Sequence, residues 1–136
     1  MENILVALDG SPLAEKGIET AIATAKQDPG SRIILMTVLE TKSPDDTLHY
    51  VVRRYLDNLV AKYGNEGVNM QAEITHGIAA EEIVRYAESK SIDLIVLTTR
   101  GRSGLKKFLL GSVAEKIITT SSVPILVCPP EKQFRG

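Results

Sequence analysis

Short apolar runs alternate along this chain with longer segments of helical spacing, and this alternation restricts the fold more than any other feature. The runs are Ile4 to Leu8, Arg32 to Val38, Asp93 to Leu97 and Pro124 to Cys128. A short, nearly uninterrupted apolar run is typical of a strand that is covered on both faces. Strands that alternate with helices of ten or more residues form right-handed βαβ units. The sequence therefore predicts an α/β fold with a parallel, doubly wound sheet and helices on both faces.

A fifth strand is predicted from a different pattern. From Val68 to Thr75, apolar and polar residues alternate with a period of two. Such a strand has one face in contact with water, so we expect it near an edge of the sheet. The predicted sheet therefore has five strands.

The first two predicted helices each begin with a serine followed by a proline. Ser11 and Ser43 are suited to the N-cap, and Pro12 and Pro44 to the first helical position. The second helix is expected to be the longest. Its predicted buried stripe is Leu48, Val51, Val52, Tyr55, Leu56, Leu59 and Tyr63. A third helix is expected around Ala80 to Lys90.

Length and composition exclude several classes of protein. With 136 residues, the chain is expected to form one domain over residues 1–136. The single cysteine, Cys128, excludes an intramolecular disulfide, and no leading apolar segment is present, so we expect a cytoplasmic location. No apolar stretch is long enough for a membrane span. With 16 basic and 17 acidic residues, the chain has no charge excess that would favour nucleic acid.

A glycine-bearing loop from Thr98 to Ser112 follows the predicted strand at Asp93 to Leu97. Glycines let a ligand approach the main chain closely, and Ser112 opens a helical pattern. The first turn of a helix has unpaired N–H groups and a positive dipole end, which together favour a phosphate. Basic side chains add positive charge to the loop: Arg100, Arg102, Lys106 and Lys107.

The same loop also has an ordinary structural interpretation. Ser112 and Glu115 fit the S-x-x-E capping box, in which each side chain satisfies a backbone N–H group. The glycines then form turns, and the basic side chains are simply solvated. The local pattern alone leaves both interpretations open.

Asp9 follows the first strand and is expected at the same edge of the sheet as the glycine loop. In doubly wound sheets, ligands bind beyond the carboxyl ends of the strands, where the strand order reverses. A carboxylate beside a phosphate cradle would suit a nucleotide, with Asp9 accepting hydrogen bonds from ribose hydroxyls. The alternative for Asp9 is an Asx turn that leads into Ser11.

Motifs spread over nearly the whole chain point to a known family. They are Ile4 to Ser11 with its D-x-S turn, Gly77 to Ile83, Asp93 to Val96, Gly101 to Gly104 with Leu109 to Ala114, and Pro124 to Val127. Together, and in this order, they resemble the universal stress protein family. Gly77 to Ile83 is similar to its G-x-P-x-x-x-I helix start, with Ala79 where proline is usual.

The resemblance implies a Rossmann-like sheet of the adenine nucleotide alpha hydrolase-like type and a homodimer formed through the last strand, Pro124 to Cys128. One branch of the family binds adenine nucleotides and carries the pattern G-x-x-G-x9-G-[S/T]. Here Gly111 and Gly101 occupy the third and second glycine positions, but Thr98 occupies the first. A β-branched threonine puts a side chain where the pattern leaves space.

By this resemblance, the ligand would be ATP or AMP, with any Mg²⁺ held largely by phosphate oxygens and water. Asp9 would lie near the ribose, the Val38 backbone near the adenine, and Gly101, Gly111 and Ser112 near the phosphates. The full set of candidate nucleotide-contact residues is Ala7, Asp9, Ser11, Val38, Thr98, Arg100, Gly101, Arg102, Gly104, Gly111, Ser112 and Val113.

Three functions compete on the sequence alone. An adenylating enzyme of related fold would resemble sequences with S-G-G-x-D-S, H-I-G-H or K-M-S-K-S signatures, and none is present, nor is a Walker A loop. His49 and His76 are expected at the surface, with no catalytic role. We expect a nucleotide-binding regulatory module of the stress response, without catalytic or metal-binding residues, that is read by another protein. Slow ATP hydrolysis and a dimer that binds no nucleotide remain as alternatives.

Overall fold

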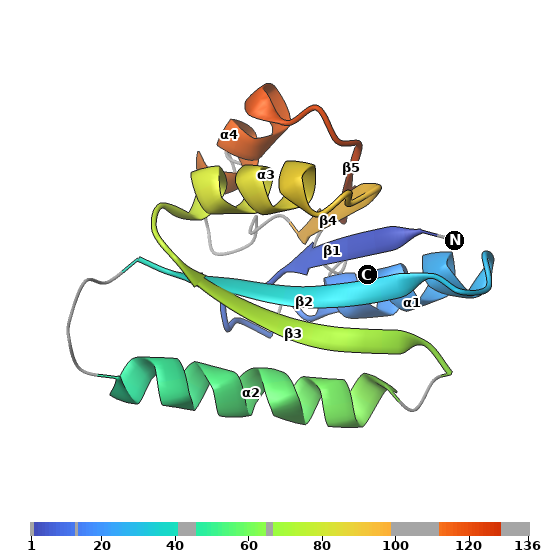
Figure 1. The fold of residues 1–136 in the computed structure, drawn as a ribbon, viewed down its shortest axis with the longest axis horizontal. Helices are drawn as coiled ribbons and strands as arrows, with labels where there is room; N and C mark the ends of the chain where they lie inside the picture. The colour runs from blue at the N-terminus through green and yellow to red at the C-terminus, as the bar shows by residue number, and fades with distance from the viewer. Residues whose placement is uncertain (1, 13, 41–45, 65–66, 99–111, 129–136) are drawn as a thin grey trace, which may run out of the picture.

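The computed structural model describes residues 2–12, 14–40, 46–64, 67–98 and 112–128. These residues form a five-stranded sheet in the order β3-β2-β1-β4-β5, and every strand pair is parallel (Figure 1). The predicted fold class is confirmed, as is the edge position of the alternating strand, and the last strand forms the other edge. The strands are β1 (Asn3–Ala7), β2 (Arg32–Leu39), β3 (Asn69–His76), β4 (Leu94–Thr98) and β5 (Ile125–Cys128).

Helices cover both faces of the sheet, as the doubly wound prediction requires (Figure 1). Two clusters of buried residues form the core. One joins α1 and α2 to Ile4 and Val6 of β1, and the other joins α3 and α4 to Leu5. Successive residues of a strand point to opposite faces, so β1 contributes to both clusters. The helices are α1 (Lys16–Lys26), α2 (Thr47–Tyr63), α3 (Ala79–Ser89) and α4 (Ser112–Thr120).

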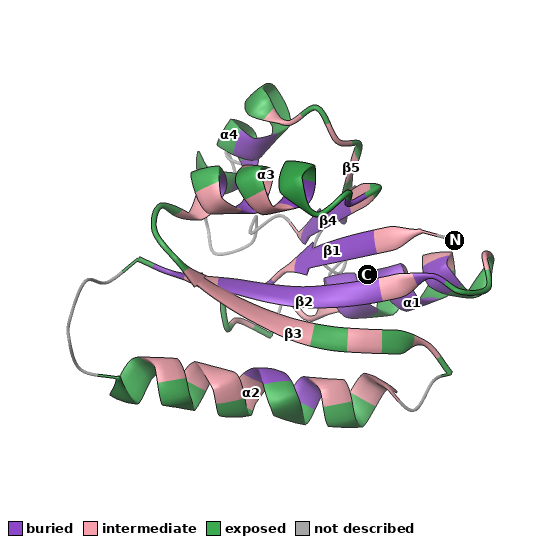
Figure 2. Ribbon diagram, viewed as in Figure 1, coloured by how far each residue is buried: buried purple, intermediate pink, exposed green. Residues whose placement is uncertain are grey.

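The central strands are the most deeply buried part of the molecule, whereas β3 has a mixed pattern (Figure 2). In β1, Ile4 and Leu5 are 0% exposed and Val6 is 1% exposed. This burial confirms that the apolar run Ile4 to Leu8 marks a strand covered on both faces.

The first helix begins later than the Ser11-Pro12 pair predicts. Ala14 N donates to the Ser11 carbonyl at 3.1 Å, and Glu15 N donates to the Pro12 carbonyl at 3.1 Å. These i to i+3 bonds form a tighter turn than an α-helix does. Ser11 therefore caps a turn, with its Oγ accepting from Ala14 N at 3.2 Å, and α1 starts only at Lys16. The Ser43-Pro44 pair lies outside the described residues.

The predicted buried stripe of α2 is wrong at its first turns. Leu48 is 45% exposed and Val51 is 54% exposed, whereas Leu56 and Leu59 are buried. Val51 lies about 140° around the helix from Leu56, so it falls outside the contact face. Leu48 shares the face of Leu59 but belongs to the first turn, where less of the core reaches the helix. The remaining predicted positions, Val52, Tyr55 and Tyr63, pack against the core as partly buried residues.

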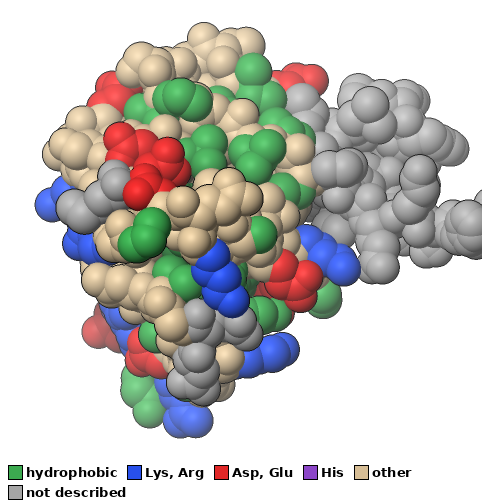
Figure 3. Space-filling model, turned by 90° about the vertical axis from the view of Figure 1, so that its right-hand side faces the viewer, with side chains coloured by type: hydrophobic (Ala, Val, Ile, Leu, Met, Phe, Trp, Pro, Cys, Tyr) green, Lys and Arg blue, Asp and Glu red, His purple; other side chains and the backbone are tan. Residues whose placement is uncertain are grey.

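Basic and acidic side chains are interspersed on the face that Figure 3 shows, which includes the end of the molecule where the N-terminus lies. This mixture agrees with the near-zero net charge of −1. Among the described helices, none is long and apolar enough to cross a membrane.

Candidate functional site

The sheet order reverses between β1 and β4, and this switch point is where a doubly wound sheet binds ligands. The chain leaves β1 toward β2 on one side, and β4 lies on the other. Ala7 ends β1 and Thr98 ends β4, so their carboxyl ends lie at one edge. The fold therefore brings the turn after β1 close to the end of the strand that precedes the glycine loop.

The turn after β1 holds an exposed carboxylate at this edge. Asp9 Oδ1 accepts a hydrogen bond from Ser11 N at 3.0 Å, which forms the Asx turn. Gly10 between them has a φ of 91°, a conformation that L side chains rarely adopt. The Asx turn holds the Asp9 carboxylate at the surface. This turn is compatible with the ribose contact that the sequence predicts for the same carboxylate.

Thr98 turns its methyl group toward α1. A Cβ atom built on Gly17 of α1 would lie 3.6 Å from Cγ2 of Thr98 and 3.2 Å from Cγ1 of Val96. Val96 and Thr98 are two positions apart in β4, so their side chains share a face. The methyl group of Thr98 therefore lies in the contact between β4 and α1, and the close approach depends on the missing side chain at Gly17.

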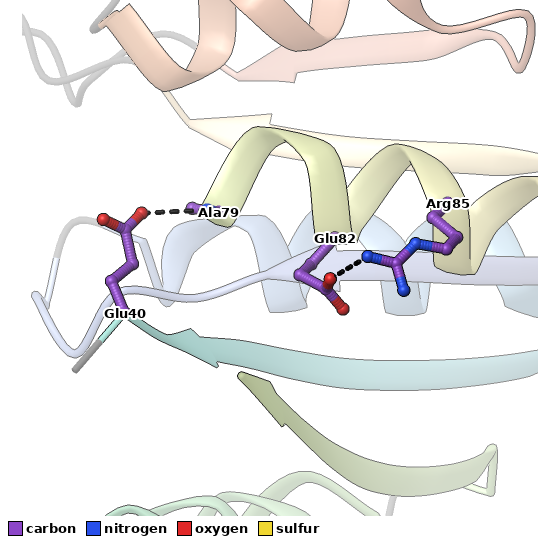
Figure 4. Close-up of polar contacts among 4 residues, drawn as sticks. All are labelled: Glu40, Ala79, Glu82 and Arg85. Carbon is purple, nitrogen blue, oxygen red and sulfur yellow. Dashed lines mark hydrogen bonds and ion pairs between the residues drawn. The ribbon is translucent and has the colours of Figure 1, made fainter. Parts of the chain in front are cut away.

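Val38 lies near the end of β2, next to β1, where it is half-buried and packs against the cluster of α3 and α4. The two residues just beyond it bond to the turn before α3 and to the first residue of α3. Gly77 N donates to the Leu39 carbonyl at 3.0 Å, and Ala79 N donates to Glu40 Oε2 at 2.8 Å (Figure 4). Glu40 was missed in the sequence. The available signal was Ala79, because alanine where proline is usual leaves an N–H group that needs an acceptor.

The start of α3 is crowded with carboxylates. Its first turn carries Glu81 and Glu82, and Glu40 approaches from β2. Glu82 also forms an ion pair with Arg85 on the same helix (Figure 4). Negative charge stabilises the N-terminus of a helix, and here the protein supplies that charge itself.

A hydrogen bond between Tyr55 and Glu15 connects α2 to the turn that precedes α1. The Tyr55 hydroxyl donates to Glu15 Oε2 at 2.7 Å. Burial raises the pKa of Tyr55, and the Glu15 hydrogen bond and the negative charges of Glu15 and Asp9 raise this pKa further.

The other candidate residues divide into those the structure describes and those it does not. Ser112 is the first residue of α4 and is exposed, as is Val113 at 41%. The contacts expected for the loop residues stay predictions, because these residues lie outside the described part of the chain: Arg100, Gly101, Arg102, Gly104 and Gly111.

His49 and His76 form a ring pair between α2 and β3. Their ring centroids are 5.5 Å apart, and the ring planes differ by 5°. His76 is exposed and His49 partly so, as expected for surface residues. Within the described ranges, no group of three or more His, Cys, Asp and Glu residues is arranged to hold a metal ion.

The parallel sheet, the helices on both faces and the polar turn at the switch point define a Rossmann-like α/β protein. The chain belongs to the universal stress protein family, whose model matches residues 1–129. It is 32% identical over 142 residues to the universal stress protein YxiE of Bacillus subtilis, with 91% of this chain and 96% of that protein covered.

Two solved structures illustrate the likeness of fold. Protein MJ0577 of Methanocaldococcus jannaschii gives a TM-score of 0.86 at 27% identity, with 97% of this chain and 98% of that chain covered. The universal stress protein of Archaeoglobus fulgidus in complex with dAMP gives a TM-score of 0.76 at 20% identity, with 93% and 97% covered. The second likeness shows the fold alone.

Proposed function

We propose that this protein binds an adenine nucleotide at the switch point between β1 and β4 and acts as a dimeric regulatory module of the stress response. The observation that carries the proposal is the Asp9 carboxylate, which the Asx turn holds exposed at the end of β1, beside the end of β4. A carboxylate at this position is suited to accept hydrogen bonds from ribose hydroxyls.

The strand order supports one orientation of the nucleotide along the carboxyl edge of the sheet. Strands β4, β1 and β2 are neighbours in the sheet. Neighbouring strands lie about 4.8 Å apart, which is close to the spacing of phosphate, ribose and base along a nucleotide. With phosphates at the loop after β4 and the start of α4, and with ribose at Asp9, the base falls at the end of β2. There the main chain at Val38 offers hydrogen-bonding groups to an adenine.

The nature of the ligand is supported by a relative. The Archaeoglobus fulgidus protein in complex with dAMP shares this fold. We infer that ATP or AMP is the ligand, and that any Mg²⁺ is bound through phosphate oxygens and water. The candidate residues of this chain supply main-chain N–H groups, hydroxyls, two guanidinium groups and one carboxylate, which would bind and orient a nucleotide without a designated catalytic base. For this reason we infer a regulatory module rather than an enzyme.

The edge strand β5 supports the homodimer. An edge strand exposes unpaired backbone groups, and pairing with a second copy satisfies them. Leu126 of β5 is 37% exposed. A second copy of the chain would cover this apolar side chain together with the strand edge.

Titration calorimetry with ATP tests the nucleotide site. Asp9→Ala is expected to raise the Kd for ATP about 10- to 100-fold, since hydrogen bonds to a charged group contribute about 1.5–3 kcal/mol. Asp9→Asn keeps an acceptor for Ser11 N and so retains the Asx turn. Comparing its Kd with that of Asp9→Ala separates the effect of losing the turn from the effect of losing the ribose contact. Asp57→Ala is the matched control, because Asp57 is an exposed carboxylate of α2 that pairs with Arg53. Equal ATP affinity in Asp9→Ala and the natural protein would overturn the proposed ribose contact.

A further inference from the structure

Two successive residues at the end of β2 are attached to the β3–α3 connection, one to Gly77 in the turn and one to Ala79, the first residue of α3. The Leu39 carbonyl accepts from Gly77 N at 3.0 Å, and the Glu40 carboxylate accepts from Ala79 N at 2.8 Å (Figure 4). The β2–β3 ladder ends at Leu39, opposite His76. The Glu40 bond therefore extends the attachment one residue beyond the sheet, at the carboxyl edge where ligands bind.

The Glu40 bond exists only because residue 79 is not proline. Ala79 is the first residue of α3, so its N–H group has no acceptor within the helix. Proline is favoured at that position and has no N–H group. The backbone of Ile78, with φ −87° and ψ 124°, is in the extended region that precedes proline readily. At position 79 the chain has an N–H donor where proline would also fit. The Glu40 carboxylate, directly after β2, accepts a hydrogen bond from this donor.

We propose that Glu40 is a positioning residue for the adenine end of the nucleotide site. This inference rests on the proposed function. Val38 lies two residues before Glu40, and its main chain is the predicted contact for the base. A binding group must be held within a fraction of an ångström, and the Glu40 bond fixes the strand end to the start of α3.

The charges around Glu40 agree with a base rather than a phosphate at this end of the site. Glu40 approaches the N-terminus of α3, whose first turn already carries Glu81 and Glu82. Three carboxylates disfavour a phosphate at this helix start through like-charge repulsion. An uncharged base lies beside them without that cost, while the start of α4 remains available to the phosphates.

A double-mutant cycle tests the positioning role. Glu40→Ala removes the acceptor and Ala79→Pro removes the donor, so each breaks the same hydrogen bond. We expect each variant to raise the Kd for ATP and for adenosine by the same factor, about three- to tenfold, and the double variant to raise it no further. Glu40→Gln keeps an acceptor oxygen and is expected to retain the natural affinity. Glu81→Ala, which removes a carboxylate from the same helix turn, is the control for charge.

The outcomes separate this inference from the proposed function. If the natural protein binds neither ATP nor adenosine, both are overturned. If it binds them and the Glu40→Ala and Ala79→Pro variants bind equally well, only the positioning role is overturned. Independent effects that multiply in the double variant, or weaker binding of ATP with unchanged binding of adenosine, would also overturn it. Thermal melting of each variant shows that the fold is retained.

Discussion

Thr98 and Gly17 act as a pair at the end of β4. The missing side chain at Gly17 lets α1 approach the sheet closely, and the methyl group of Thr98 lies in that contact. The family pattern has glycine at position 98, and the threonine was expected to narrow the phosphate loop. The observed direction of its methyl group gives the side chain a packing role at α1.

Replacing Thr98 by glycine tests this packing role. Thr98→Gly is expected to lower the free energy of unfolding by about 1–2 kcal/mol, because glycine costs backbone entropy in a strand and the buried methyl contact is lost. The Kd for ATP is expected to change less than about threefold, which is below the effect of one hydrogen bond. Urea denaturation and calorimetry measure the two quantities. Thr98→Val, which keeps the branched shape, is the control. A large gain in ATP affinity in Thr98→Gly would show that the threonine obstructs the site.

Tyr55 gives the protein a defined response to high pH. Its folded pKa is raised above the value of about 10 that it has when unfolded. The folded state therefore holds the phenolic proton more tightly, and the stability from this group is present below about pH 10 and lost as pH rises further. Tyr55→Phe is expected to cost about 1 kcal/mol at neutral pH and to reduce the fall in stability between about pH 9 and pH 11. Urea denaturation at several pH values measures this; the same pH slope in both proteins would contradict it.

Among the elements, β5 has the clearest testable role. It forms one edge of the sheet, and Leu126 is exposed on it. Leu126→Asp would place a charge in the proposed dimer contact and is expected to convert the dimer to single chains of 14.8 kDa. Light scattering measures the mass. Tyr50→Asp is the matched control, because Tyr50 is an exposed apolar residue of α2, 62% exposed. If the Leu126→Asp variant is still a dimer, the dimer contact does not lie at β5.

Strands were predicted more accurately than helix starts, for a physical reason. A strand covered on both faces needs an apolar run, which is visible in the sequence, as at Ile4 to Leu8. A helix start depends on which backbone hydrogen bonds are present in the residues before it. Ser11 and Pro12 have the right chemistry for a helix, yet i to i+3 bonds close a separate turn and delay α1 to Lys16. In the same way, helical spacing predicted that Leu48 of α2 is buried, but it could not indicate how far the core extends along the helix. Leu48 is in fact exposed.

At the scale of the whole molecule, the strand order determines which residues meet. The position of Asp9 near the end of β4 could be predicted, because parallel strands bring their carboxyl ends to one edge. Ala79 indicates an N–H group that needs an acceptor, but the sequence could not identify Glu40 as that acceptor, since it is 39 residues away and the contact depends on how β2 ends beside α3. Polar bonds between distant elements leave no periodic pattern in a sequence. The sequence therefore predicted which strand ends meet at the candidate site but not the side chain of Glu40 that supports it, and the contacts of the motif residues with a nucleotide stay predictions.

The central claim is that the chain forms a dimer that binds an adenine nucleotide at the switch point of its sheet. Nondenaturing mass spectrometry of the freshly purified full chain, before and after addition of ATP, tests both parts at once. The expected mass is twice that of the 14.8 kDa chain plus an adenine nucleotide bound to each chain. A mass of one chain with no bound nucleotide, unchanged at millimolar ATP, would contradict the claim.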